Sequence, residues 1–131
     1  MAHPTMFDPD DPILGRVRSL ALAMPGTAEK ISHGRPTFYT KKVFAYYGGS
    51  LKVDGVWVQH PHSVVVLLDE SERAAVLGEH GAYVPAYLGP SGWVGRDLDQ
   101  NTDWVEVTEL LDASYRRTAP KRHIARLDAQ H

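Results

Sequence analysis

The chain has 131 residues, of which 43% are hydrophobic, and its formal net charge at pH 7 is -2. This length predicts one domain with a hydrophobic core, and it leaves no room for a nucleotide-binding domain beside a separate substrate domain. The sequence contains no cysteine. Disulfides, thiolate nucleophiles, iron–sulfur clusters and zinc fingers are therefore excluded.

No apolar run approaches the roughly 20 residues that a membrane-spanning helix needs. The N-terminal segment, residues 1–8, lacks the basic and apolar regions of a signal peptide. We therefore expect a cytoplasmic protein with no membrane partner.

Charge is distributed unevenly along the chain. Residues 12–62 contain seven cations and two anions, whereas residues 63–112 contain ten acids and two arginines. Residues 113–127 contain five cations and no acid. If the first and third segments meet in space, the protein has a basic face and an acidic face; the alternative is that these are solvated surface charges without a partner.

The first predicted element is a helix. Residues 10–12, Asp-Asp-Pro, are typical of a helix start, and Pro25-Gly26 stops the helix. Its apolar residues recur at helical spacing, and the stripe expected to pack on a sheet is Ile13, Val17, Leu20 and Met24.

Strands are expected next. The sequence predicts a short edge strand over 27–32, a hairpin over 36–47, and strands over 56–60 and 63–68. Gly48-Gly49 and Asp54-Gly55 are predicted turns, and Pro61 separates the last two strands. The run 63–68 is continuously apolar, which favours a central position in the sheet.

A short helix is predicted after Asp69, whose side chain forms a capping-box pattern with Glu72, and it ends at Gly78 or Gly81. Pro85 makes the run 83–88 an edge strand or a loop, whereas the run 93–99 is a better strand candidate.

Asp103 and Glu106 predict the start of a longer helix. The residues expected on its buried face are Trp104, Val107, Leu111 and Tyr115. Pro120 ends this helix, and residues 121–127 are either a final helical turn or a mobile basic tail.

Together these elements predict a single α+β domain in which N- and C-terminal helices pack on an antiparallel sheet. The core is expected over about residues 13–118, with a basic C-terminal tail over 119–131. Large aromatic side chains contribute most to burial in a small domain, and those assigned to the core are Phe38, Phe44, Trp57, Trp93 and Trp104.

Sequence motifs for catalysis and cofactor binding are lacking. The chain has no GxSxG, GxGxxG or P-loop motif. His60 and His62 are close in sequence and His33 lies on a predicted bend, but no metal-ligand spacing accompanies them. We expect His60 and His62 in a solvent-exposed turn and a local hydrogen bond at His33, with no metal, no cofactor and no catalytic residue assigned.

Cations and aromatic residues form the remaining pattern. The hairpin is expected to carry four basic residues near one of its ends, and four more follow at the end of the last helix. The candidate anion-binding residues are His33, Arg35, Lys41, Lys42, Arg116, Arg117, Lys121 and Arg122.

Several separated motifs resemble the MmcQ/YjbR-like family over about residues 13–125. They are Ala21-Leu22-Ala23-Met24-Pro25-Gly26, His33-Gly34-Arg35-Pro36-Thr37-Phe38, Lys42-Val43-Phe44-Ala45, Gly92-Trp93-Val94-Gly95, Asp97-Leu98-Asp99, Asp103-Trp104, and Ser114-Tyr115 through Ala119-Pro120-Lys121-Arg122. The resemblance implies a CyaY-like fold similar to frataxin and a proposed double-wing arrangement for DNA binding. It implies no particular reaction.

Our first hypothesis is therefore a binding module for DNA rather than an enzyme. Lys41 and Lys42 would contact phosphates, Arg35 would support the hairpin, and Lys121 with Arg122 would extend the contact.

Two alternatives remain open. One is a small anionic ligand or substrate in a pocket between the hairpin and the last helix, held by His33, Arg35, Lys42 and Trp93. The other is a protein-interaction domain that uses an exposed sheet edge or the acidic segment 97–112. The oligomeric state is left open.

Overall fold

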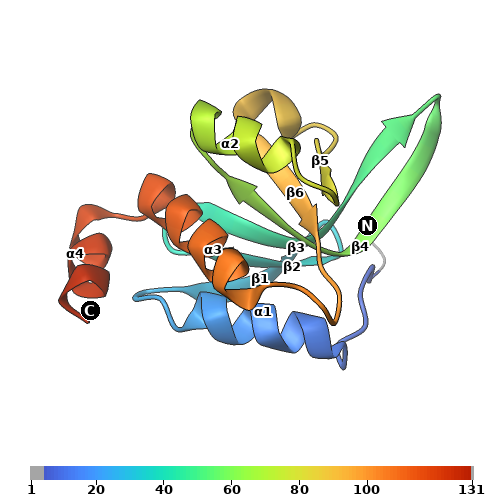
Figure 1. Ribbon diagram of the computed structural model, residues 1–131. Coiled ribbons are helices and arrows are strands. Elements are labelled where there is room, and N and C mark those ends of the chain that lie inside the picture. Colours follow the sequence, from blue (N-terminus) through green and yellow to red (C-terminus); the bar gives the residue numbers. More distant parts are fainter. Residues whose placement is uncertain (1–4, 131) are drawn as a thin grey trace.

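A six-stranded sheet with four α-helices forms the part of the chain that the computed structural model describes, residues 5–130 (Figure 1). Residues 1–4 of the N-terminal segment and the last residue of the expected basic tail lie outside it. In chain order the elements are α1 (Pro12–Leu22), β1 (Ala28–Ser32), β2 (Arg35–Tyr39), β3 (Val43–Val53), β4 (Val56–Leu67), α2 (Glu70–Leu77), β5 (Ala82–Tyr83), the 3-10 helix η1 (Gly89–Ser91), β6 (Trp93–Asp97), α3 (Trp104–Thr118) and α4 (Lys121–Ala129).

Every strand pair is antiparallel, and the strand order is β1-β2-β3-β4-β6-β5. Helices α1 and α3 pack against β3 and β4, while α2 lies beside β5 and β6. This arrangement confirms the predicted α+β class and the edge position of β1. Within residues 5–130, no helix combines the length and the apolar character that a membrane crossing requires.

Two apolar clusters cover the two faces of the sheet. Alternation along β4 separates them, because Val64 and Val66 belong to the larger cluster and Val65, between them, belongs to the smaller one. The larger cluster includes Leu14, Val17, Phe38, Phe44, Leu111 and Tyr115, all fully buried. The smaller cluster centres on Val65, Tyr83 and Trp93.

Helix α1 begins as predicted but buries a different stripe. Asp11 is its N-cap and accepts a hydrogen bond from the Ile13 N–H at 2.9 Å. The fully buried side chains are Leu14, Val17 and Ala21, whereas the predicted Ile13 and Leu20 are only partly buried. The predicted stripe was wrong in part because Ile13 and Leu20 flank the true contact line, and Met24 reaches the core from beyond the helix end.

Strands β3 and β4 are longer than predicted, and two expected interruptions are absent from them. Gly48-Gly49 lies inside β3 and Pro61 lies inside β4. Tyr47 pairs with Val64 and Gly49 pairs with His60, so three residues of β4 lie opposite Gly48 alone. This β-bulge accommodates Pro61, which has no N–H for the ladder. The sequence predicted a turn and a strand break here because glycine and proline are typical of turns as well as of bulges.

The hairpin formed by β3 and β4 extends beyond the rest of the sheet. Residues 49–53 and 56–60 pair only with each other, whereas β3 pairs with β2 through residues 43–46 and β4 pairs with β6 through residues 63–67. We call residues 49–60 the arm; it projects from the sheet at the upper right of Figure 1. The predicted turn at Asp54-Gly55 forms its tip.

The C-terminal helices also follow the predictions in most respects. Asp103 caps α3, as expected, and accepts hydrogen bonds from the Val105 and Glu106 N–H groups. Residues 121–129 form the helix α4 rather than a mobile tail. Its Leu127 is buried, which gives this short helix an apolar attachment to the domain.

Most of the aromatic residues predicted in the core are buried or partly buried, but one is exposed. Phe38, Phe44 and Trp93 are buried, which confirms them as core residues, and Trp104 is partly buried under the guanidinium of Arg16. Trp57 was wrongly assigned to the core, because it lies on the arm and is 43% exposed.

Close packing of the Tyr83 ring predicts the effect of one substitution. A Cβ at Gly95 in β6 would overlap this buried ring, whereas a Cβ at Gly15 in α1 would meet nothing within 4 Å. We expect Gly95→Ala to lower the free energy of unfolding by roughly 1–3 kcal/mol. The control Gly15→Ala should raise it by about 0.5–1 kcal/mol, because alanine loses less backbone entropy in a helix. Urea denaturation followed by circular dichroism measures both, and equal effects would contradict the packing.

Candidate functional site

The eight predicted anion-binding residues do not form one cluster. His33 lies in the turn between β1 and β2, and Arg35 begins β2, whereas Lys41 and Lys42 follow the other end of that strand. A strand rises about 3.3 Å per residue, so the two pairs are separated by roughly 15 Å or more. The expectation that all four lie near one end of the hairpin was wrong, because β2 itself stands between them.

Lys41 and Lys42 lie instead at the end of the molecule where α3 finishes. The Ser114 hydroxyl of α3 donates a hydrogen bond to the carbonyl of Phe44, two residues after Lys42, at 2.5 Å. It also accepts one from the Leu67 N–H at 2.9 Å. This buried serine therefore holds the C-terminal half of α3 over the start of β3.

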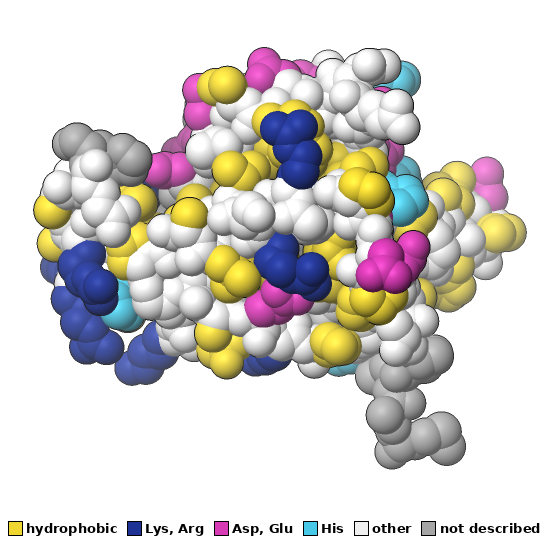
Figure 2. Space-filling view, turned by 90° about the horizontal axis from the view of Figure 1, so that it is seen from below, with side chains coloured by type: hydrophobic (Ala, Val, Ile, Leu, Met, Phe, Trp, Pro, Cys, Tyr) yellow, Lys and Arg dark blue, Asp and Glu magenta, His cyan; other side chains and the backbone are white. Residues whose placement is uncertain are grey.

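Helix α4 adds further cations at the same end. The ring of its His123 lies against Gly26, in the connection between α1 and β1. Lys and Arg side chains gather around α4 at the left of the molecule (Figure 2). We call the exposed cations of the β2–β3 turn and α4 the basic end: Lys41, Lys42, Lys121, Arg122 and Arg126.

The basic end differs in its partners from three arginines elsewhere in the protein, Arg18, Arg96 and Arg116. Within residues 5–130, none of its five side chains takes part in an ion pair. Arg18 pairs with Glu29, and Arg96 pairs with Glu79 and Glu106. The charge of the basic end is therefore not neutralised by neighbouring carboxylates.

Arg116 has a structural role that the sequence did not indicate. Its guanidinium pairs with Asp112 at 2.5 Å and with Asp128 of α4 at 2.8 Å, which joins α4 to α3. Hydrogen bonds to Asp128 and then Asp112 raise the pKa of Arg116. Because two carboxylates already occupy this side chain, it is a poor candidate for contacting a phosphate.

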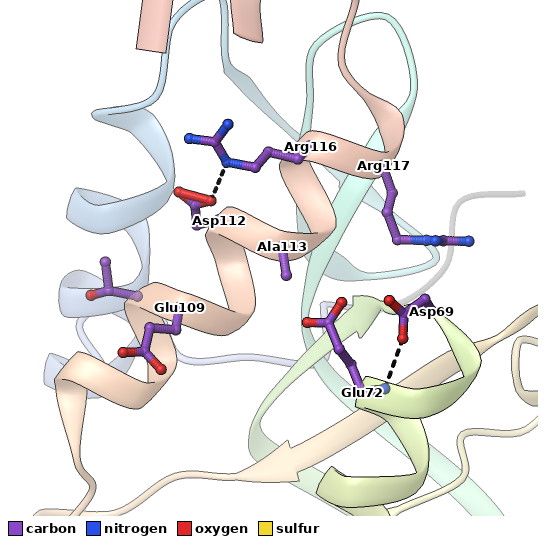
Figure 3. Close-up of a pocket in the computed structure, with 8 residues that line it drawn as sticks. Asp69, Glu72, Glu109, Asp112, Ala113, Arg116 and Arg117 are labelled. Carbon is purple, nitrogen blue, oxygen red and sulfur yellow. Dashed lines mark hydrogen bonds and ion pairs between the residues drawn. The ribbon is translucent and has the colours of Figure 1, made fainter. Parts of the chain in front are cut away.

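Arg117 lines a hollow between α2 and α3 with a volume of about 620 Å³. Its other lining residues include four carboxylates, and they are Asp69, Glu72, Thr108, Glu109, Asp112, Ala113 and Arg116. Figure 3 shows carboxylates on both walls, with Arg117 above Asp69. This mixture of charges suits an anion less well than the basic end does.

The pocket expected between the hairpin and the last helix does not coincide with the hollow lined by Arg117. A second hollow, of about 530 Å³, runs from His80 to Leu110 along the acidic loop before α3. Neither hollow is lined by His33, Arg35, Lys42 or Trp93. Trp93 packs edge-on against Tyr46, with ring centroids 5.3 Å apart, in the smaller apolar cluster.

Arg35 lies across the bulge between β3 and β4. Its Nη2 donates a hydrogen bond to Oε1 of Gln59 at 2.7 Å, and its Nη1 lies so close to Gly48 that a Cβ at this position would overlap it. Burial lowers the pKa of this guanidinium, and among the described residues it has no carboxylate in ion-pair distance. Gly48 therefore leaves the space in which Arg35 rests.

His33 and His60, which were considered as metal ligands, form hydrogen bonds with neighbouring side chains. Nδ1 of His60 donates to Asp97 at 2.7 Å, and its ring stacks on Tyr83 with centroids 3.9 Å apart. His33 contacts the Ser32 hydroxyl at 3.3 Å, which confirms the expected local hydrogen bond. Residues 5–130 contain no group of three or more metal-ligating side chains suited to an ion.

Asp11 connects helix α1 to the β-bulge. Besides capping α1, its carboxylate accepts hydrogen bonds from the Tyr47 hydroxyl at 2.5 Å and from Nδ1 of His62 at 2.8 Å. The expectation that His60 and His62 lie in an exposed turn was wrong, since both belong to β4, although the side chain of His62 remains 53% exposed. Burial opposes ionisation of Asp11, but the three hydrogen bonds outweigh it and lower its pKa.

The geometry describes a small α+β protein with a basic end free of ion pairs and a hollow of mixed charge between α2 and α3. A protein-family model named YjbR matches residues 22–117, which is most of the chain. The chain belongs to the YjbR family, and this confirms the resemblance drawn from its motifs. A search among curated proteins gives no match. Helix α4 lies outside the matched segment.

The Asp11 carboxylate predicts a specific dependence of stability on pH. Its pKa is lower in the folded protein than in the unfolded chain, so its stabilising contribution is complete above the unfolded value of about 3.9 and is lost as pH falls through the folded value. Asp11→Asn keeps a capping side chain but should flatten the loss of stability between pH 5 and pH 2.

Asp10→Asn removes an exposed carboxylate one residue earlier and serves as the control. Urea titrations across this pH range measure both variants. An acid dependence in Asp11→Asn equal to that of the unmodified protein would show that Asp11 is not the titrating group.

Proposed function

We propose that this protein is a DNA-binding module that contacts backbone phosphates through the basic end. The observation that supports this proposal is that all five of its cations are exposed and lack ion pairs, whereas three arginines elsewhere are held by carboxylates. Lysine and arginine side chains that are free of carboxylates can neutralise phosphates without first breaking a pair.

The arrangement of the basic end suits a backbone contact. Lys41 and Lys42 lie in the turn between β2 and β3, and Lys121 and Arg122 are the first residues of α4. Cations from two separate elements can therefore contact different phosphates. Such contacts fix the position of a nucleic acid without reading base edges. Binding through them should be largely independent of sequence and strongly dependent on salt.

A net charge of -2 is compatible with binding a polyanion, because the five cations of the basic end are exposed and free of ion pairs. The four carboxylates of the hollow between α2 and α3 repel a strand that approaches from that side. Charge separation on the surface therefore orients the encounter, in addition to attracting DNA to the basic end.

Fluorescence anisotropy of a labelled oligonucleotide at several salt concentrations tests the proposal. Each phosphate contact contributes about 0.7–0.9 to the slope of log affinity against log salt. Lys42→Gln and Arg122→Gln should each weaken binding and reduce this slope by about one contact. Arg16→Gln removes one exposed cation of α1 and should change neither quantity beyond a general charge effect. Salt-independent binding, or equal effects of all three variants, would overturn the proposal.

A second candidate is a small anion held at Arg35. The half-buried guanidinium without a carboxylate partner favours it, because burying an unneutralised charge is costly and an anion would offset that cost. Calorimetric titration with inorganic phosphate should give a binding isotherm that Arg35→Gln abolishes and Lys42→Gln leaves unchanged. No heat with phosphate at millimolar concentration would exclude this site.

A further inference from the structure

The arm and the β5–β6 loop beside it each display one large aromatic side chain that does not contribute to either apolar cluster. Trp57 is 43% exposed and Tyr87 is 86% exposed, and their ring centroids lie 6.1 Å apart with 37° between the planes. Aromatic rings placed together on a surface mark a binding site more often than isolated exposed residues do. Trp57 and Tyr87 are therefore suited to a ligand with a flat ring that can stack on one of them.

Tyr87 is held in this exposed position by a strained backbone. Its φ is 66°, in the left-handed region that a bulky residue rarely adopts. The flanking loop is fixed, because the Ala86 N–H donates to the Ser50 carbonyl of β3 at 2.9 Å and the Leu88 N–H donates to the Ala86 carbonyl at 2.8 Å. A glycine would adopt this conformation without strain, so the tyrosine ring is present at a conformational cost.

Cations and an amide accompany the two rings. Lys52 pairs across the arm with Trp57, and its Nζ lies 5.4 Å from the centroid of that ring. Gln59 lies on the same face of β4 as Trp57, two residues away, and holds the Arg35 guanidinium at 2.7 Å. Asp54, at the tip of the arm, is the only acid between residues 31 and 68.

From this juxtaposition we infer that the arm binds an unpaired nucleic-acid strand, with bases stacked on Trp57 and Tyr87 and phosphates near Lys52 and Arg35. This inference rests on the proposed function and specifies its ligand. Exposed aromatic rings beside cations are the elements with which proteins bind single strands, because every base offers a face for stacking. A duplex buries its base faces within the helix, so the arm distinguishes unpaired from paired strands.

The basic end and the arm lie at opposite ends of β3. Lys42 precedes this strand and Lys52 lies near its far end, so the ten residue steps from one to the other span at most roughly 33 Å. One strand of several nucleotides can therefore contact both places, and the two sets of contacts are separable by mutation.

The deciding variant is Tyr87→Gly, because it removes the ring and relieves the strained φ at the same time. Its thermal stability should equal or exceed that of the unmodified protein, which excludes unfolding as the cause of any loss. Its affinity for a labelled oligothymidine of about 12 nucleotides should fall roughly 5- to 150-fold, the range for loss of one stacked base. Affinity for a duplex of the same length should not change.

Two further variants complete the design. Tyr87→Trp keeps a ring and should retain tight binding of the single strand. Val105→Ala shortens another exposed apolar residue, 68% exposed in the first turn of α3, and should bind like the unmodified protein.

The outcomes separate this inference from the proposed function. If Lys42→Gln weakens binding but Tyr87→Gly does not, or if the duplex binds better than the single strand, DNA binding stands and stacking on the arm is overturned. If neither DNA binds in a salt-dependent way, both proposals fail. Loss of single-strand binding alone in Tyr87→Gly, with rescue by Tyr87→Trp, supports the inference.

Discussion

A β-bulge, in which three residues of β4 lie opposite Gly48, allows the hairpin of β3 and β4 to continue past Pro61. Without it, Pro61 would interrupt the ladder and the hairpin would end near the sheet. The Ser63 hydroxyl closes the bulge by donating to the His60 carbonyl at 2.8 Å, and in turn it lies 2.7 Å from the Tyr83 hydroxyl. The local increase in twist that accompanies a bulge accounts for the direction of the arm.

Several otherwise unrelated features meet at this bulge. Asp11 joins α1 to it through Tyr47 and His62, and Arg35 occupies the space that Gly48 leaves. Burial, together with the Asp11 carboxylate, raises the pKa of Tyr47, so its hydroxyl remains a donor throughout the physiological range. A carboxylate buried among three donors is tolerated because its lone pairs are satisfied, whereas removing the carboxylate would leave a buried hydroxyl without its acceptor.

Local sequence signals predicted the parts of the fold that local interactions determine. Asp11, Asp69 and Asp103 were placed correctly at helix starts because a cap requires only the next three residues. The bulge was missed because Gly48 and Pro61 are 13 positions apart and only their pairing distinguishes a bulge from a turn. Trp57 was misassigned because the alternating pattern of a strand shows on which face a residue lies. It does not show whether another element covers that face.

The candidate site was harder to predict than the fold, for a related reason. The distribution of charge along the sequence identified the basic segments. It did not show that β2 places Lys41 and Lys42 at the end of the molecule near α4, and His33 and Arg35 at the opposite end. The pairing of Arg116 with Asp128 depends on how α4 packs, and no spacing rule relates those two residues. Tyr87 gave no sequence signal, since its left-handed backbone arises from hydrogen bonds of its neighbours.

The hydrogen bond between Ala86 and Ser50 also covers part of the exposed edge of the arm. A two-stranded hairpin that extends past its sheet exposes backbone groups along both borders, and such borders can recruit strands of other molecules into aggregates. The β5–β6 loop takes up the Ser50 carbonyl and lies against the arm there, while Lys52 places a charge close by. The segment that presents Tyr87 thus leaves fewer backbone groups of the arm available for pairing with a strand of another molecule.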